Sequence, residues 1–175
     1  MRQLLLLRHA KSSWDDPRLS DHSRPLSSRG RDAAARMGEA MRTLDLSPDV
    51  VLVSSARRTL QTLELLLPFP ETPITEPMNA LYLATAPQML GVLHTIAETV
   101  RSVLLIGHNP GLHELAQMLT GSARDQAETK RMAARYPTAA LAEFAVPGPW
   151  HALGPGGARL VRFLRPRDLP LPAGA

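Results

Sequence analysis

The stretch Gln3-Leu4-Leu5-Leu6-Leu7-Arg8-His9-Ala10 decides the fold of this chain. Its apolar residues form one continuous run, which is typical of a strand buried on both faces of a sheet. The run ends abruptly in an arginine and a histidine. Polar side chains directly after a buried strand lie at the edge of the sheet, where a ligand can reach them. Arg8 and His9 are therefore the first candidates for a functional site.

Later apolar runs predict the rest of the sheet. Buried strands are expected at 50–53 and 102–106, a short strand at 72–75, and two late strands at 139–146 and 159–164. Helices are expected between them, at 28–44, 57–67, 87–100 and 110–119, from apolar residues at three- and four-residue spacing. This alternation predicts an α/β fold, a three-layer sandwich with a mostly parallel central sheet and helices on both faces.

Serine, asparagine and proline mark the expected helix starts. Ser28 is expected to cap the first helix, and Ser54-Ser55 the second. Asn109 is expected to cap the helix that Pro110 opens. The loop 11–27 is long enough to act as a covering segment, and the polar segment 121–135 is expected to be mobile.

Composition bounds the class of protein. Neither a repeat nor a linker divides the 175 residues, so we expect a single domain at 1–165, followed by a Pro-rich C-terminal tail at 166–175. The chain has no cysteine, which excludes a disulfide framework and a cysteine nucleophile. The N-terminal apolar run is too short to cross a bilayer and lacks the features of a signal peptide. We therefore expect a cytoplasmic protein with no membrane partner.

The chain is basic, with a net charge of +4 and a pI of about 10.3. Nearly all of its cationic side chains are arginines, which are scattered along the sequence without a basic run. Few aromatic residues are present for stacking on bases. This pattern favours small anionic ligands, and we expect no nucleic-acid partner.

Three predicted buried strands end in polar residues suited to phosphate. The ends read Arg8-His9, Ser54-Ser55-Ala56-Arg57 and Gly107-His108-Asn109. If the strands run parallel, these ends meet at one edge of the sheet. Histidine can attack phosphorus through a ring nitrogen, arginine can hold phosphate oxygens through its planar fork, and a helix start at Asn109 favours an anion. The convergence predicts a phosphate site.

The other histidines have simpler interpretations. His22, His94, His113 and His151 are expected to be structural or surface residues. The chain contains no HExxH pattern, and the spacing of His108 and His113 does not match a zinc site. We therefore expect neither a metal nor a cofactor.

The motifs together resemble those of a known family. Leu7-Arg8-His9-Ala10 is similar to the Arg-His-Gly signature of the histidine phosphatase (phosphoglycerate mutase-like) superfamily, and 24–30, 54–62 and 106–111 follow in that family's order and spacing. The resemblance covers nearly the whole chain. The compact size, Arg-His-Ala-Lys-Ser-Ser-Trp, Leu81-Tyr82 and Gly-His-Asn-Pro-Gly look most like its SixA-type branch of phosphohistidine phosphatases.

The resemblance assigns roles to the polar strand ends. It makes His9 the nucleophile that takes the phosphoryl group, with Arg8 and Arg57 binding its oxygens. His108 donates a further hydrogen bond, and Asn109 belongs to the same phosphate-binding set. The implied activity is a metal-independent phosphatase that acts on protein phosphohistidine through a phospho-His9 intermediate. Its partner is a phosphorylated protein or a small phosphorylated molecule.

Two departures from the family pattern bear on the substrate. Ala10 replaces the usual glycine, and Lys11 stands where many mutases have an acidic residue, which weakens a mutase interpretation. The candidate general acid is Glu76, although a loop charge is the favoured interpretation of this residue. Imidazole is easily protonated near neutral pH, so a phosphohistidine substrate depends less on such an acid.

Two other functions stay open from the sequence. One is a small-molecule phosphoester phosphatase that uses Glu76 as general acid to protonate the leaving alkoxide. The other is a non-catalytic phosphate-binding regulatory module that keeps the pocket without turnover. The presence of His9, Arg8, Arg57 and His108 together argues against the second.

Overall fold

The computed structural model describes residues 1–121 and 127–171. One mixed sheet runs through the centre of the molecule, in the strand order β3-β2-β4-β1-β5-β6. Its strands are β1 (Arg2–Arg8), β2 (Val50–Ser54), β3 (Ile74–Met78), β4 (Ser102–Gly107), β5 (Leu141–Val146) and β6 (Arg159–Leu164). The first four run parallel, whereas β5 is antiparallel to both β1 and β6. The predicted mostly parallel sheet is confirmed.

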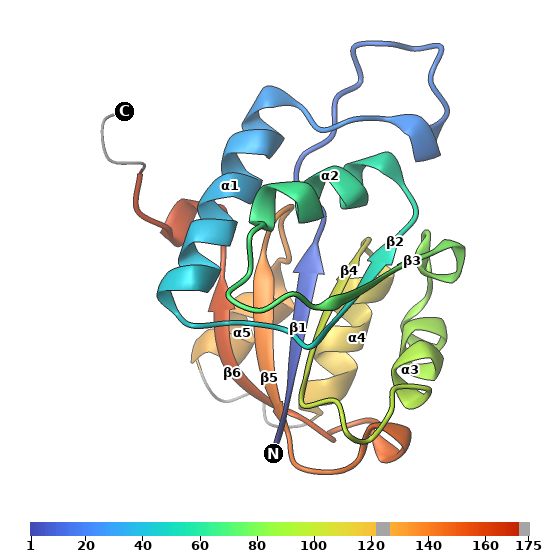
Figure 1. Ribbon diagram of the computed structural model, residues 1–175, viewed down its shortest axis with the longest axis vertical. Helices are drawn as coiled ribbons and strands as arrows, with labels where there is room; N and C mark the ends of the chain where they lie inside the picture. Colours follow the sequence, from blue (N-terminus) through green and yellow to red (C-terminus); the bar gives the residue numbers. More distant parts are fainter. Residues whose placement is uncertain (122–126, 172–175) are drawn as a thin grey trace.

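Helices cover both faces of this sheet (Figure 1). On one face lie α1 (Ser28–Thr43) and α2 (Arg57–Leu66). On the other face lie α3 (Ala86–His94), α4 (Gly111–Thr120) and α5 (Ala127–Ala134). The three-layer α/β architecture expected from the sequence is therefore confirmed.

The leucine run of β1 explains why the sheet needs cover on both sides. Leu4 and Leu6 belong to the core that includes residues of α3, α4 and α5. Leu5 and Leu7 belong to the opposite core, which includes residues of α1 and α2. Successive side chains of a strand point to opposite faces, so a continuous apolar run fills both cores at once. All four leucines are completely buried.

Several predicted boundaries differ from the observed ones. The cap of α1 is Ser27, whose side chain accepts a hydrogen bond from the backbone of Gly30. The residue before α2 is Ala56, and the predicted Ser54-Ser55 cap is wrong because both serines contact histidines instead. Strand β3 begins and ends later than predicted, and α3 ends at His94 rather than near residue 100.

The polar segment 121–135 contains a helix that the sequence did not indicate. Helix α5 buries Thr129 and Met132, and this short apolar face is too weak to stand out in a polar sequence. The remainder of the segment, 122–126, lies outside the described residues. Within the expected tail, residues 166–171 are described and contact the domain, because Arg36 of α1 donates hydrogen bonds to the carbonyls of Pro166 and Leu169.

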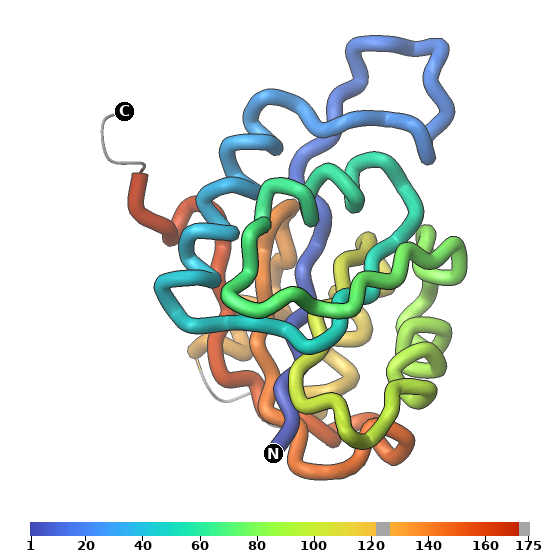
Figure 2. The backbone as a smooth tube through the Cα atoms, viewed as in Figure 1, coloured from blue at the N-terminus to red at the C-terminus, as the bar shows by residue number. Residues whose placement is uncertain are grey.

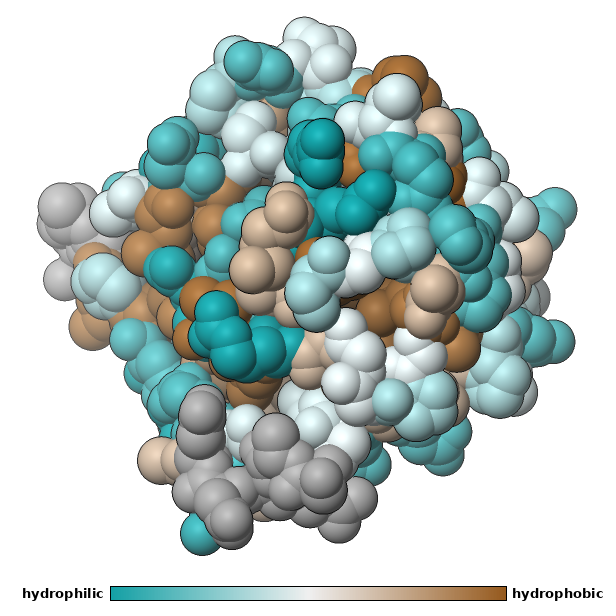
Figure 3. Space-filling model, turned by 90° about the horizontal axis from the view of Figure 1, so that it is seen from below, coloured by the Kyte–Doolittle hydropathy of each residue, from teal (hydrophilic) through white to brown (hydrophobic). Residues whose placement is uncertain are grey.

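The segment 11–27 joins β1 to α1 above the carboxyl ends of the parallel strands (Figure 2). It contains a 3-10 helix at Asp21–Ser23, and an antiparallel bridge pairs Ser12 with Leu26. The opposite end of the molecule, seen in Figure 3, carries mixed hydrophilic and hydrophobic side chains. Among the described residues, the helices are too short or too polar to span a bilayer.

Candidate active site

The carboxyl ends of three parallel strands bring the polar residues together. Arg8 ends β1 and lies in register with Gly107, the last residue of β4. His9 and His108 therefore follow neighbouring strands at the same level, and their ring centroids are 5.1 Å apart. Ser54 ends β2, on the other side of β4, and its side chain contacts His108. The strand ends predicted to converge lie together.

His9 is held with one ring nitrogen turned to the backbone. Its Nδ1 lies 2.7 Å from the carbonyl oxygen of Ala10, and because a carbonyl only accepts, Nδ1 carries the proton. In the neutral ring, the lone pair is then on Nε2. Burial, followed by the positive charges of Arg58 and Arg8, lowers the pKa of His9 to about 4, against the stabilising hydrogen bond to Ala10. At neutral pH, Nε2 of His9 is therefore unprotonated, which is the form of histidine that can attack an electrophile.

A residue of α2 holds the backbone at Ala10 in place through a hydrogen bond. The backbone N–H of Ala10 donates to Oγ1 of Thr62 at 3.0 Å, and that hydroxyl donates to the carbonyl of Arg58. Ala10 is completely buried, so this backbone donor depends on a protein acceptor. Thr62 thereby sets the path of the backbone that orients His9.

His108 is also neutral, and two hydrogen bonds define its tautomer. Arg58 has only donors, so its Nη2 at 3.3 Å makes Nδ1 of His108 the acceptor. The Nε2 proton is then donated to Oγ of Ser54 at 2.7 Å. Burial first, then the neighbouring His9 and Arg58, lowers the pKa of His108 to about 3. A phosphoryl group between the two histidines would introduce the negative charge that favours protonation of His108.

Arg8 forms one wall of the site. Its Nη1 donates to the carbonyl of Tyr136 at 3.0 Å, and its buried Nε has no acceptor among the described residues. Burial, together with the positive charges of Arg135 and Arg58, lowers the pKa of Arg8. Asn109 donates from Nδ2 to the same carbonyl of Tyr136, so the structure uses its amide to brace this wall. Asn109 does not cap α4, whose first turn has no side-chain cap.

The second arginine of the site is Arg58. Arg57, the arginine expected from the sequence, has an exposed side chain at the start of α2. Arg58 is 3% exposed and reaches His108. The structure therefore brings Arg58, and not Arg57, to the two histidines.

The helical period explains this one-residue difference. The buried face of α2 comprises Arg58, Thr59, Thr62, Leu63 and Leu66. Leu63 and Leu66 can be recognised in the sequence as buried apolar residues of this helix. Residues four or eight positions before them lie on the same face. That face includes 58 and 59 but not 57. The pattern was present in the sequence and could have selected Arg58.

Asp21 fixes Arg58 from the segment above the sheet. Its Oδ2 accepts from the Tyr82 hydroxyl at 2.5 Å and from Arg58 at 3.1 Å, and its Oδ1 accepts from Arg24 at 2.9 Å. The Tyr82 bond, helped by both arginines, holds the pKa of Asp21 well below its usual range. Asp21 is thus a permanent carboxylate that positions Arg58 rather than a proton donor.

From the sequence, Asp21 has no assigned role and Tyr82 is only part of a family motif, because neither residue lies in a periodic pattern that predicts the direction of its side chain. His22 is expected from the sequence to be a structural or surface residue. The structure puts Nε2 of His22 2.9 Å from Oγ of Ser55, with its ring edge-on to Tyr82 at 4.8 Å. Tyr82 in turn lies 5.5 Å from His108, ring centroid to ring centroid. His22 and Tyr82 therefore form the outer rim of the site.

Glu76 lies away from this cluster. It is exposed on the edge strand β3 and pairs with Leu52, two residues before the strand end at which Ser54 meets His108. Within the described part of the chain, no carboxylate forms a hydrogen bond or ion pair with His9 or His108. Over the same residues, no group of His, Asp and Glu side chains is arranged to hold a metal ion.

Comparisons with known proteins agree with this geometry. Residues 4–78 match the model of the histidine phosphatase superfamily (branch 1). An uncharacterized protein of Mycobacterium tuberculosis is 34% identical over 165 residues, which cover 92% of this chain and 100% of that protein.

Two solved structures share the whole fold. A candidate SixA phosphohistidine phosphatase from Nakamurella multipartitia has a TM-score of 0.82 and 26% identity, covering 94% of this chain and 96% of that one. The protein histidine phosphatase SixA complexed with tungstate has a TM-score of 0.75 and 25% identity, covering 95% and 98%. On these matches and the paired histidines at the strand ends, the chain belongs to the histidine phosphatase superfamily.

Proposed function

We propose that this chain is a phosphatase that removes the phosphoryl group from protein phosphohistidine through a phospho-His9 intermediate. One observation carries the proposal: the hydrogen bond from Nδ1 of His9 to the Ala10 carbonyl keeps the proton on Nδ1 and the lone pair on Nε2. The lowered pKa of His9, about 4, keeps the ring in this form at neutral pH. The family and its SixA neighbours support phosphatase activity in general.

In the first step, the lone pair of Nε2 forms a bond to phosphorus. The bond from phosphorus to the substrate's imidazole nitrogen breaks, and its electron pair returns to that ring. A substrate ring protonated on its other nitrogen leaves as neutral imidazole. No carboxylic acid is needed for this departure, which agrees with the exposed position of Glu76 on β3.

In the second step, water attacks phosphorus. The electron pair of the phosphorus–nitrogen bond returns to Nε2, and the protons of the water stay with the inorganic phosphate. Because His9 keeps its Nδ1 proton throughout, it leaves phosphorus as the neutral imidazole with which it began. The same backbone hydrogen bond therefore serves both steps.

The cations of the site are suited to the charge of the transferring group. Nε of Arg8 and Nε of Arg58 are buried N–H groups with no acceptor among the described residues. Phosphoryl transfer depends chiefly on positioning and charge stabilisation, which buried guanidinium groups supply. Tungstate, the ligand of one SixA neighbour, is a tetrahedral oxyanion like phosphate. We propose Arg8, Arg58 and His108 as the phosphoryl-binding residues, with Arg58 in the role first given to Arg57.

A comparison of substrates tests the proposal. The full chain is assayed with a phosphohistidine peptide and with sugar phosphates, each with wild type and Glu76→Gln. We expect a higher kcat/KM for the phosphohistidine peptide and less than about a twofold effect of Glu76→Gln, since this exposed charge makes no contact with the site. Preference for sugar phosphates, with loss of that activity in Glu76→Gln, would support the phosphoester alternative instead. Phosphate binding without turnover of any substrate would indicate a regulatory module.

The cytoplasmic location of the protein stays a prediction from the sequence.

A further inference from the structure

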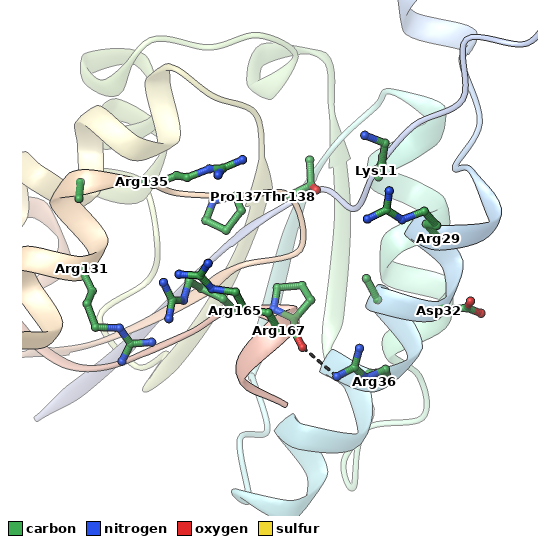
Figure 4. Close-up of a pocket in the computed structure, with 13 residues that line it drawn as sticks. Lys11, Arg29, Asp32, Arg36, Arg131, Arg135, Pro137, Thr138, Arg165 and Arg167 are labelled. Carbon is green, nitrogen blue, oxygen red and sulfur yellow. Dashed lines mark hydrogen bonds between the residues drawn. The ribbon is translucent and has the colours of Figure 1, made fainter. Parts of the chain in front are cut away.

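A cavity of about 680 Å³ opens between α1, the end of α5 with the segment after it, and the turn after β6 (Figure 4). Its lining is strongly basic, and Asp32 is the acidic residue within it. We call this cavity the basic groove; its cationic residues are Lys11, Arg29, Arg36, Arg131, Arg135, Arg165 and Arg167. Arginines that look scattered in the sequence are gathered here by the fold.

The topology places the basic groove at the same edge of the sheet as His9. Strands β1 and β6 are each antiparallel to β5, so they run in the same direction. Lys11 follows the end of β1, and Arg165 and Arg167 follow the end of β6. Both ends therefore emerge at the same edge of the sheet, one on each side of β5, and the groove lies at the edge that carries the candidate active site.

Neighbouring residues of one segment connect the groove to that site. Pro137 and Thr138 line it, and the preceding carbonyl, of Tyr136, accepts the hydrogen bond from Arg8. In Figure 4, Arg135 points inward from one side and Arg29 from the other, with Lys11 beside Arg29. A chain that leaves the phosphoryl site along this wall enters the basic groove.

The groove contains two kinds of cation. Arg131 and Arg165 form ion pairs with Asp168, and Arg36 donates to backbone carbonyls, so these three hold the fold together. Among the described residues, no carboxylate lies within 4.0 Å of the charged groups of Lys11, Arg29, Arg135 and Arg167. These four side chains are available to an acidic ligand.

We propose that the basic groove binds acidic side chains that flank the phosphohistidine of a substrate protein. Its other lining residues include Ala33, Ala134, Pro137 and Pro166, which offer small apolar contacts to an extended polypeptide. No aromatic side chain lines the groove in the described residues, so it lacks the stacking surface typical of single-stranded nucleic-acid sites. The assignment rests on the proposed activity toward phosphorylated proteins.

Direct binding tests the groove without turnover. The full chain is titrated into a fluorescein-labelled, glutamate-rich peptide and into its glutamine counterpart, with anisotropy as the readout. The groove variant combines Arg29→Gln with Arg167→Gln. The single-charge control is Arg101→Gln, because Arg101 is exposed and precedes β4, at the end of the sheet away from the groove. We expect the acidic peptide to bind more tightly, the groove variant to weaken it about tenfold, and the control to change it less than about twofold.

Two binding results would overturn the proposal. One is equal affinity for the glutamate and glutamine peptides. The other is a single-stranded oligonucleotide that binds more tightly than the acidic peptide and loses affinity in the same groove variant, which would make this a nucleic-acid site. Binding that weakens as salt increases is expected, because these side chains lie at the surface.

Turnover then separates this proposal from the proposed function. Phosphohistidine peptides with acidic and with neutral flanks are compared in wild type and in the groove variant. We expect a lower KM for the acidic flank, lost in the groove variant at unchanged kcat. Equal KM values for both flanks would overturn the docking site and leave the phosphatase proposal intact. Absence of phosphohistidine turnover, with groove-dependent peptide binding retained, would overturn the phosphatase proposal alone.

Discussion

Replacing Arg58 by glutamine tests how the site holds the transferring phosphoryl group. Arg58 is 3% exposed and donates both to Asp21 and to His108, so its guanidinium is fixed before substrate arrives. Removal of one preorganised donor to a developing charge costs about 100- to 1,000-fold in rate. Glutamine replaces neither the charge nor the fork of donors. We therefore expect Arg58→Gln to lower kcat/KM for a phosphohistidine peptide by about 100- to 1,000-fold.

The adjacent arginine supplies the matched control. Arg57→Gln removes the same charge from an exposed side chain at the same helix end, and we expect less than about a twofold change. Arg58→Lys keeps the charge but loses the planar fork, so its activity is expected between that of Arg58→Gln and wild type. Steady-state phosphate release measures all three variants, and circular dichroism checks that each is folded.

Either of two results would exclude this role of Arg58. If Arg57→Gln lost as much activity as Arg58→Gln, the phosphoryl contact would belong to the exposed arginine. If Arg58→Gln stayed within about threefold of wild type while folded, the buried guanidinium would not stabilise the transition state.

Three further predictions follow from individual contacts. As the pH is lowered, kcat/KM should fall only near the pKa of His9, about 4, because protonation removes the lone pair of Nε2. If kcat/KM, corrected for the ionisation of the substrate, instead falls around pH 6.5, the ordinary pKa of histidine, this prediction is wrong. Thr62→Val leaves the buried Ala10 N–H without its acceptor and should lower the free energy of unfolding, measured by urea denaturation, by about 1–3 kcal/mol. Thr62→Ser keeps the hydroxyl group and should retain most of the wild-type stability. A Cβ at Gly111 would lie 2.0 Å from the Ala84 carbonyl oxygen, so Gly111→Ala should destabilise the protein by at least about 1–3 kcal/mol. A Cβ at Gly91 would meet nothing within 4 Å, so Gly91→Ala should stabilise the protein through α3 by about 0.5–1 kcal/mol. Equal unfolding midpoints for the two variants would contradict this prediction.

The sheet could be predicted because its central strands are continuous apolar runs. A run such as 4–7 is unambiguous when both faces are buried, and the order of strands and helices then restricts the topology to a few possibilities. Helix α5 could not be predicted, because its stability comes from burying Thr129 and Met132 against the rest of the fold rather than from its own pattern.

Some residues of the site could likewise be predicted from the sequence, and others could not. Arg8 ends a strand, and His9 and His108 each follow one, so their proximity could be inferred from topology alone. The choice between Arg57 and Arg58 required the phase of a helix, which the sequence contained. The contacts of Asp21 with Arg58 and Tyr82 join a loop to a helix and to a distant turn, and no local pattern encodes such a meeting.

The most direct test of the account is to find the phosphoryl group on His9. The enzyme is mixed with a ³²P-labelled phosphohistidine peptide and quenched in alkali, in which phosphohistidine survives, and the labelled enzyme peptide is mapped by mass spectrometry. We predict acid-labile label on His9, its absence in His9→Ala, and its retention in His151→Ala, which changes an exposed histidine. Label on another residue, or full phosphate release by folded His9→Ala, would contradict the account.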